Sequence, residues 1–161
     1  WNCEVERGAT VSSFGTTINV LEGLLEHKRA VGGSAEVLEA GHRGAEYLLE
    51  RRLLRRKSTG EVIDPSWLQF AFPTWWHYDV LRGLDHLRDA GLTGDERVAE
   101  ALEVVERNRD RDGRWPLQKV YDTGSDLELE REGEPSRWLT LRALRVLDWF
   151  GGRPEARQPR Q

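Results

Sequence analysis

The stretch F-P-T-W-W-H-Y-D-V-L-R-G-L (72–84) gathers residue types that could do chemistry. His77 and Asp79 could transfer a proton, and the two tryptophans could stabilise a cation or form a platform for a sugar. We interpret His77 as a hydrogen-bonded core histidine, with a catalytic role as the alternative. The elements that position these side chains decide between the two interpretations.

Helical spacing divides this stretch into two faces if a helix begins at Thr74. One face is an apolar stripe of Trp76, Val80, Gly83, Leu84 and Leu87. The other face holds Trp75, Asp79, Arg82 and His86. We therefore predict that Trp76 and Tyr78 pack in the core, and that the second face is the one of functional interest.

A period of 60 residues organises the chain into repeated helices. V-L-E-G-L (20–24) matches V-L-R-G-L (80–84), and L-R-G-L (81–84) matches L-R-A-L (141–144). A second type of helix alternates with the first, since S-A-E-V-L-E-A-G (34–41) falls on G-D-E-R-V-A-E-A (94–101). We predict helices over 12–29, 34–56, 74–90, 95–108 and 136–149. Their predicted N-caps are Ser12 or Ser13, Thr74 and Ser136 for the first type, and Ser34 and Asp95 for the second.

The two helix types differ in how much of their surface is apolar. Helices of the first type carry large apolar residues on most of their circumference, whereas the second type has a narrow apolar stripe between Glu and Arg. A helix that is apolar nearly all round is enclosed, and one with a stripe is peripheral. The predicted fold is therefore all-α, with repeated helical hairpins in two layers that form a partial α/α toroid over residues 1–150.

Two long connections and the C-terminal end fall outside these helices. The loops at 57–73 and 109–135 exceed the usual length of connections in a domain. In the second loop, the acidic, turn-rich segment 122–134 is predicted to be mobile or to form a short hairpin. The tail 151–161 is predicted to be disordered from its composition.

The composition excludes several classes of function. The net charge of −4 leaves no basic field for nucleic acid, and R-R-L-L-R-R-K (51–57) is interpreted as a solvated helix end. No apolar run approaches the roughly 18 residues of a transmembrane segment. The single cysteine, Cys3, cannot form an intramolecular disulfide, so a reducing, cytoplasmic setting is expected. We interpret Cys3 as a small buried hydrophobe.

D-G-R-W (112–115), which follows the helix predicted at 95–108, resembles the end of a QW repeat in the prenyltransferase and squalene cyclase superfamily. There Gly113 would permit the tight turn, and the Trp115 ring would stack between neighbouring hairpins. Trp1 resembles the last residue of another such turn. The resemblance extends, within a bacterial squalene cyclase-like group of unassigned function, to E-V-I-D-P-S-W (61–67), W-H-Y-D-V-L (76–81) and W-L-T-L-R-A-L (138–144). It implies the C-terminal half of a toroid whose N-terminal half is missing.

The catalytic motifs of that superfamily are absent from this segment. Neither D-R-D-G (110–113) nor D-T-G-S-D (122–126) matches the D-x-D-D acid motif of squalene cyclases. The Asp-x-Cys zinc pair of protein prenyltransferases is not formed, because Trp1 stands two residues before Cys3. We therefore assign no catalytic residue from the resemblance, and we predict no metal site and no cofactor.

Equivalent positions on the inner helices could converge on the lumen of a complete toroid. The predicted lumen-lining residues are Glu22, Trp75, His77, Asp79, Arg82 and Arg142, and the predicted mouth residues are Asp64 and Trp67. A wall of mixed charge favours a polar ligand over a pure hydrocarbon, because an unpaired buried charge is costly. The alternative is that these charges form salt bridges or are solvated, and that Asp64 caps the turn at Ser66 and Trp67.

Three functions remain open from the sequence. The chain could be an enzyme of the terpenoid cyclase class, or a relic of one, with a terpenoid-like or polar small molecule in the lumen. It could be a non-catalytic scaffold that binds a ligand or a protein on its concave face. A carbohydrate-active α/α barrel is the third hypothesis, since paired carboxylates and Trp platforms suit a sugar. An exposed apolar edge on the inner helices predicts self-association, or association with the missing half.

Overall fold

A computed structural model of the chain describes residues 1–122 and 129–151. The helices in this part are α1 (Phe14–Val31), α2 (Ala35–Leu49), α3 (Val80–Asp89), α4 (Ala99–Arg107) and α5 (Arg137–Gly151). Short 3-10 helices lie at Val5–Arg7, Pro65–Leu68 and Glu96–Val98, and an antiparallel sheet pairs β1 (Trp115–Pro116) with β2 (Pro135–Ser136). The predicted helical class is confirmed. None of the described helices is both long and apolar enough to cross a bilayer.

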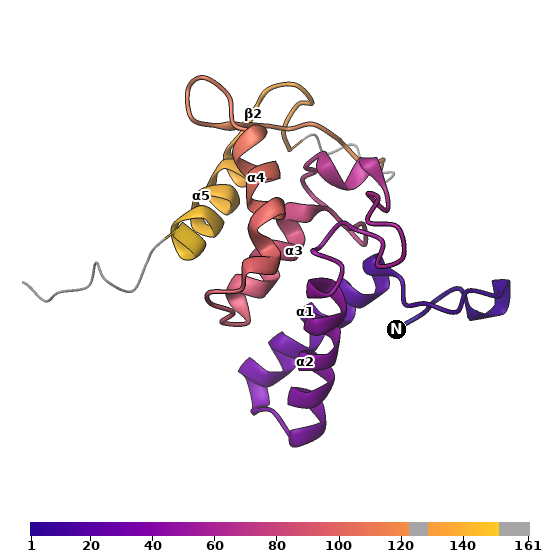
Figure 1. The fold of residues 1–161 in the computed structure, drawn as a ribbon. Coiled ribbons are helices and arrows are strands. Elements are labelled where there is room, and N and C mark those ends of the chain that lie inside the picture. Colours follow the sequence, from indigo (N-terminus) through magenta and orange to yellow (C-terminus); the bar gives the residue numbers. More distant parts are fainter. Residues whose placement is uncertain (123–128, 152–161) are drawn as a thin grey trace, which may run out of the picture.

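The helices are arranged around α3. Helix α1 packs against α2, and α3 packs against both α4 and α5 as well as α1. In Figure 1, α3 lies between the α1–α2 pair and α5. Because α3 has neighbours on several sides, seven of its ten residues are buried.

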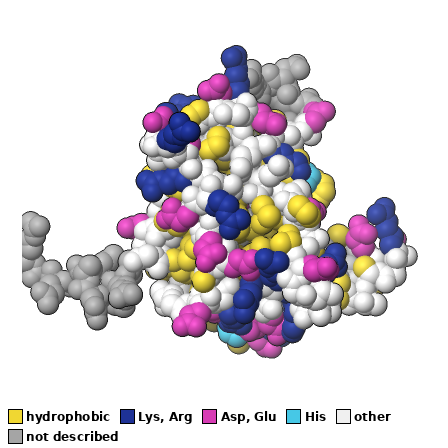
Figure 2. All heavy atoms as spheres, turned by 45° about the horizontal axis from the view of Figure 1, so that its top comes forward, with side chains coloured by type: hydrophobic (Ala, Val, Ile, Leu, Met, Phe, Trp, Pro, Cys, Tyr) yellow, Lys and Arg dark blue, Asp and Glu magenta, His cyan; other side chains and the backbone are white. Residues whose placement is uncertain are grey.

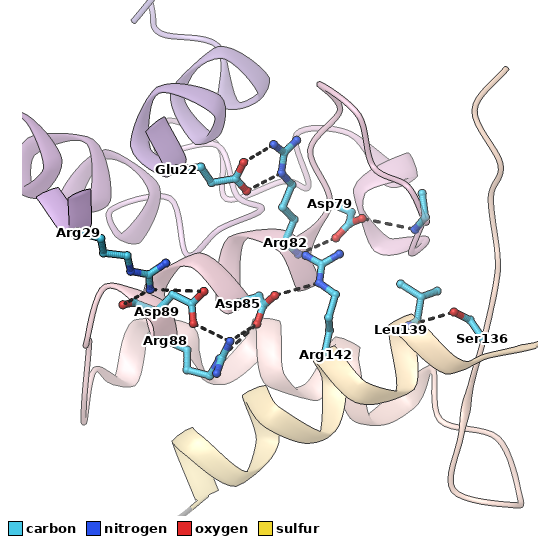
Figure 3. Close-up of polar contacts among 11 residues, drawn as sticks. Glu22, Arg29, Asp79, Arg82, Asp85, Arg88, Asp89, Ser136, Leu139 and Arg142 are labelled. Atoms are coloured by element: carbon cyan, nitrogen blue, oxygen red, sulfur yellow. Dashed lines mark hydrogen bonds and ion pairs between the residues drawn. The ribbon is translucent and has the colours of Figure 1, made fainter. Parts of the chain in front are cut away.

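Local capping explains where most helices begin. The hydroxyl oxygen of Ser13 accepts a hydrogen bond from the backbone N–H of Thr16, and Ser34 caps α2 in the same way. Ser136 accepts from the N–H of Leu139 at 3.0 Å at the start of α5 (Figure 3). These predicted caps are confirmed, because each side-chain oxygen satisfies an amide that the helix leaves without a partner.

Helix α3 begins at Val80 and not at Thr74. The carboxylate of Asp79 accepts a hydrogen bond from the N–H of Arg82 at 2.7 Å, and Asp79 itself is extended, with φ −139° and ψ 164°. Asp is among the strongest N-cap residues, so the helix starts here and the preceding residues form a loop. The prediction of core packing is therefore wrong for Trp76, which is 67% exposed, and confirmed for Tyr78, which is buried.

Helix α2 ends at Leu49 and does not continue to residue 56. Arg52 and Leu53 have positive φ values of 48° and 67°, which an α-helix cannot contain. This change of direction turns Leu53 and Leu54 into the core, where both are buried. The run 51–57, predicted as a solvated helix end, is instead a series of turns that carries basic side chains around a buried hydrophobic pair.

The three helices of the first type are not equally buried, contrary to the prediction. The buried residues of α1 are Phe14, Thr17, Ile18 and Leu21, and those of α5 are Leu139, Ala143 and Val146. Leu141 and Leu144 are 49% and 45% exposed, although Leu81 and Leu84, 60 residues earlier, are fully buried. The reason is that no element in the described part of the chain covers that side of α5.

The D-G-R-W turn leads from α4 into the small sheet. Gly113 has a φ of +78°, a conformation that favours glycine, as predicted from the turn. The Trp115 ring is fully buried, and its Nε1–H donates a hydrogen bond to the carbonyl oxygen of Val105 in α4 at 2.7 Å. Its backbone N–H donates to the hydroxyl of Thr140 in α5 at 3.1 Å. Trp115 therefore connects α4 to α5.

Two predicted segments fall partly outside the described residues. Residues 123–128 belong to the acidic segment 122–134, predicted to be mobile or a hairpin, and residues 152–161 belong to the tail 151–161, predicted to be disordered. The sheet formed by β1 and β2 closes the connection that contains the acidic segment. This pairing places the start of α5 beside the turn that follows α4.

The absence of a side chain at Gly83 allows α3 to approach two buried residues closely. A Cβ atom at this position would lie 2.5 Å from the Tyr78 hydroxyl oxygen and 3.0 Å from a methyl carbon of Leu53. We expect Gly83→Ala to lower the free energy of unfolding by about 1–3 kcal/mol, because buried groups must shift to admit the methyl group. Urea denaturation followed by circular dichroism measures this change.

Gly23→Ala in α1 is the matched control. A Cβ atom there would meet nothing within 4 Å, and the residue is exposed. Alanine in an open helical position should stabilise the protein by about 0.5–1 kcal/mol, since glycine loses more backbone entropy on folding. If both substitutions change the free energy of unfolding in the same direction, the close approach at Gly83 does not explain the effect of Gly83→Ala.

Candidate functional site

A pocket of about 1000 Å³ opens where the N-terminal end of α1 meets the loops that follow α2 and precede α3. Its walls come from Glu4 and from residues within 11–15, 47–58, 63–67, 76–78 and 119–121. Small-molecule sites in proteins usually have volumes of about 300–1000 Å³, so this cavity could hold a sizeable ligand. We call it the aromatic pocket.

Four aromatic rings form one wall of the aromatic pocket. The ring centroid of Phe14 lies 4.6 Å from that of Trp67 and 4.9 Å from that of Tyr78, and Tyr47 lies 5.6 Å from Phe14. Tyr78 donates its hydroxyl hydrogen to the carbonyl oxygen of Leu53 at 2.8 Å. Because the rings contact one another and the Tyr78 hydroxyl is satisfied, the wall presents a fixed apolar surface.

A stack of three rings forms another part of the lining. The His77 imidazole lies between Trp76, with centroids 3.8 Å apart, and Tyr121, with centroids 3.5 Å apart. The ammonium nitrogen of Lys119 lies 4.8 Å from the centroid of the Tyr121 ring, in cation–π geometry. Burial lowers the pKa of His77 below its usual value, so the imidazole is neutral at neutral pH.

Basic side chains outnumber acidic ones in the lining. The cations are Arg51, Arg56, Lys57 and Lys119, and the carboxylates are Glu4 and Asp64. With His77 neutral, the lining carries a net charge of +2, opposite in sign to the net charge of −4 on the whole chain. On the face shown in Figure 2, by contrast, acidic and basic side chains are interspersed around hydrophobic patches. The aromatic pocket therefore favours an anion.

The four cations differ in how strongly neighbours hold them. Arg51 and Lys57 both form ion pairs with Glu50, at 3.5 Å and 2.8 Å. Arg56 donates to a backbone carbonyl at 3.5 Å, and Lys119 forms no ion pair with any described residue. Arg56 and Lys119 are thus the cations with the most capacity left for a ligand.

Arg82 lies beside the aromatic pocket and fixes the loop that precedes α3. Its Nε–H donates to a carboxylate oxygen of Glu22 at 2.8 Å, and Nη2 donates to the amide oxygen of Asn19 at 3.0 Å. Nη1 donates to the carbonyl oxygens of Trp75 and His77. Figure 3 shows the Glu22–Arg82 pair bridging α1 and α3. Arg82 thereby orients the segment that supplies Trp76 and His77 to the lining.

A second polar network joins α3 to α5. Arg142 donates from Nε to Asp85 at 2.9 Å, and Arg88 binds the same carboxylate at 2.8 Å (Figure 3). Asp79 is buried and accepts a further hydrogen bond from the amide of Ala71 at 3.4 Å. Burial raises the pKa of Asp79, against the lowering effect of Arg142 and of the amide donors. These contacts hold elements together, as expected for charges that form salt bridges.

All of the predicted site residues except Trp75 fall into two groups. Asp64, Trp67 and His77 line the aromatic pocket, and Asp64 also caps its turn by accepting from the N–H of Ser66 at 2.8 Å, as its capping interpretation predicted. The polar networks contain Glu22, Asp79, Arg82 and Arg142. Trp75 is half-exposed and is not part of the pocket lining.

Most of the lining comes from residues that the sequence did not predict to be site residues. The main ones are Phe14, Tyr47, Arg51, Lys119 and Tyr121. The basic run 51–57 was the available signal, but a helix expected through residue 56 placed it on a solvated face. The segment at 118–121 carries no pattern of its own. It is brought to the pocket by a hydrogen bond from the N–H of Gln118 to the carbonyl oxygen of Phe70.

Cys3, His27 and His42 lie outside the lining of the aromatic pocket. Cys3 is exposed, so its predicted burial is wrong, because the segment before α1 lies outside the core. His27 and His42 are exposed on α1 and α2. Within residues 1–122 and 129–151, no group of three or more His, Cys, Asp or Glu is placed to hold a metal ion.

Comparison with known proteins gives no family for this chain. No protein-family model, no curated protein and no solved structure matches it.

Proposed function

We propose that the aromatic pocket binds a small amphipathic molecule that combines an apolar, terpenoid-like body with an anionic group. One observation carries this proposal: a single cavity of about 1000 Å³ combines a wall of packed aromatic rings with a net positive lining. The apolar body would lie against Phe14, Trp67 and Tyr78, which exclude water from it. The anionic group, a phosphate or a carboxylate, would meet Arg56 and Lys119.

Binding is better supported than catalysis. Asp64 holds a turn through its bond to the N–H of Ser66, and Asp79 is buried as the N-cap of α3, away from the lining. A general acid or base must lie within hydrogen-bond reach of the reacting proton. The lining supplies apolar surface and cations, which hold a ligand, more clearly than it supplies an acid–base pair.

The helical hairpins, in this proposal, belong to a partial α/α toroid of the prenyltransferase and squalene cyclase type. The packing of α1 on α2 and of α3 on α4 supports the arrangement. The D-G-R-W turn supports it as well, since Gly113 has a positive φ and Trp115 is buried against α4. Asp64 and Trp67 would then lie at the mouth of the toroid.

Isothermal titration calorimetry with farnesyl diphosphate and farnesol tests the proposed binding. The two probes share the apolar body and differ in the anionic group. We expect the diphosphate to bind at least about tenfold more tightly, since one good charge-assisted contact contributes about 1.5 kcal/mol or more. Equal affinities for the two probes, or no saturable binding of either, would contradict the proposal.

A pair of double variants locates the anion site. Arg56→Gln with Lys119→Gln removes two cations from the lining, and should bring the affinity for farnesyl diphosphate close to that for farnesol. Arg43→Gln with Lys28→Gln makes the same change in charge on α2 and α1, at residues that do not line the pocket. The control should keep the preference, because screening weakens distant charges. If both double variants lose the same amount of affinity for farnesyl diphosphate, the anionic group does not bind at Arg56 and Lys119.

A further inference from the structure

Helix α5 carries an apolar face that described residues cover only in part: the Phe72 ring stacks on Trp138, and the carbonyl oxygen of Leu92 accepts a hydrogen bond from Trp149. Four large side chains on this face are between 41% and 49% exposed: Trp138, Leu141, Leu144 and Trp149. At 100° per residue they lie within one side of the helix, opposite the buried Leu139, Ala143 and Val146. Figure 1 shows α5 at the edge of the molecule, with α3 on one side of it. We call this surface the α5 face.

The 60-residue period indicates that the α5 face is a packing surface. Leu81 and Leu84 of α3 are fully buried, and the residues 60 positions later are the exposed Leu141 and Leu144. Helix α3 has α4 packed against it, whereas α5 packs mainly against α3 and the small sheet. A contiguous apolar patch of this kind marks an interaction site, because its exposure to water is unfavourable.

The charges on the α5 face indicate what covers it. Arg145 and Asp148 lie among the four apolar side chains, are exposed, and form no ion pair with any described residue. A two-fold axis brings the same patch of two copies together, so that a residue i meets residue j twice. With two α5 helices antiparallel, Arg145 of each copy can lie opposite Asp148 of the other. The patch is then complementary to itself in both charge and apolar surface.

We propose that the chain forms a symmetric dimer through the α5 face, with the Arg145–Asp148 pair formed twice across the two-fold axis. The interface lies apart from the aromatic pocket, whose lining includes no residue of α5. The proposal is therefore independent of the ligand. We infer that a second copy of this chain covers the α5 face, and not a different protein, because the face carries both Arg145 and Asp148 and is therefore complementary to itself.

Reversal of either charge should weaken the dimer, and mixing the two reversed variants should restore it. Arg145→Asp places two like-charge pairs in the dimer, and Asp148→Arg does the same with the opposite sign. Each variant should raise the dissociation constant of the dimer by roughly a hundredfold, in sedimentation velocity over a concentration series. When the two variants are mixed, both pairs are opposite in charge again, so a heterodimer should form with an affinity close to that of the original chain. Circular dichroism confirms that each variant is folded.

Two control variants accompany this test of the dimer, and three results would contradict the proposal. Arg43→Asp changes an exposed charge on α2 and should leave the dissociation constant within about twofold. The double variant Arg145→Asp with Asp148→Arg should dimerise by itself. A monomer at several hundred micromolar for the original chain would overturn the proposal, and so would dimerisation unaffected by either single reversal. Failure of the mixed variants to form a heterodimer, with both folded, would also overturn the pairing.

Discussion

Replacement of Trp115 by alanine is expected to lower the free energy of unfolding by about 3–5 kcal/mol. The ring is fully buried within the core cluster that also contains Leu139 of α5, and its Nε1–H donates to the carbonyl oxygen of Val105 in α4. The substitution leaves a cavity between two helices and an acceptor without its donor. Guanidinium denaturation followed by circular dichroism gives the change directly.

Two further variants keep this prediction testable if the alanine variant does not fold. Trp115→Phe keeps most of the apolar volume and loses the hydrogen bond to Val105, so a loss of about 1–2 kcal/mol is expected. Trp76→Ala removes a ring of the same type that is 67% exposed, and should change stability by less than about 1 kcal/mol. Comparable losses for Trp115→Ala and Trp76→Ala would mean that Trp115 does not join α4 to α5.

Arg82→Met is expected to lower the free energy of unfolding by about 3 kcal/mol. The Arg82 side chain is 5% exposed, and its guanidinium group bonds to Glu22, to Asn19 and to the carbonyl oxygens of Trp75 and His77. Methionine keeps an unbranched apolar stem but leaves all four partners without their donor. Glu22 is 40% exposed and can be hydrated, so the loss should lie at the lower end of the range for broken buried pairs.

The geometry of the guanidinium group distinguishes this role from a simple charge effect. Arg82→Lys keeps the positive charge but cannot span four acceptors, so it should recover less than half of the lost stability. Arg43→Gln breaks an ion pair with Glu39 in which both side chains are 67% exposed, and should cost less than about 0.5 kcal/mol. Full recovery by lysine would show that the fork of hydrogen bonds contributes little.

Local signals in the sequence predicted where several of the helices begin. Ser13, Ser34 and Ser136 cap their helices as expected, because the bond from hydroxyl oxygen to backbone amide lies within three residues. The turn at Gly113 is local in the same sense, since a positive φ is a property of one residue. Features that depend on a few neighbouring residues could thus be predicted.

The beginning of α3 depended on contacts that lie far apart in sequence. Thr74 and Asp79 are both acceptable N-caps, and spacing favoured the longer helix with Trp76 in its apolar stripe. The shorter helix leaves the carbonyl oxygens of Trp75 and His77 free to accept hydrogen bonds from Arg82, which α1 anchors through Glu22. This tertiary interaction is not visible in local propensity.

The aromatic pocket could be predicted only in part for the same reason. Asp64, Trp67 and His77 were predicted to be site residues and do line the pocket. Their partners Tyr47 and Tyr121 come from α2 and from a loop after α4, and nothing in the local pattern around either residue indicates that they meet. The lining is defined by the packing of distant segments, such as the bridge between Ala71 and Lys119.

The 60-residue period identifies matching positions in the helices, but it does not predict which of the matched residues are buried. Leu81 and Leu141 occupy matching positions, but burial also requires a neighbour, and the described residues provide one only for α3. An exposed leucine at a position that is buried in another repeat is therefore a signal for a missing partner. The α5 face lies at such a position, on one of the inner helices for which an exposed apolar edge was predicted.

The indole N–H signals of the seven tryptophans, in a ¹H–¹⁵N correlation spectrum recorded during titration with farnesyl diphosphate, test the central claim most directly. The signals of Trp67 and Trp76 should shift on binding, because both rings line the aromatic pocket. Those of Trp115 and Trp149, whose Nε1–H groups donate to backbone carbonyls outside the pocket, should stay in place. Shifts at Trp138 and Trp149 with Trp67 and Trp76 unchanged would show that the ligand binds on the α5 face, and would contradict the account.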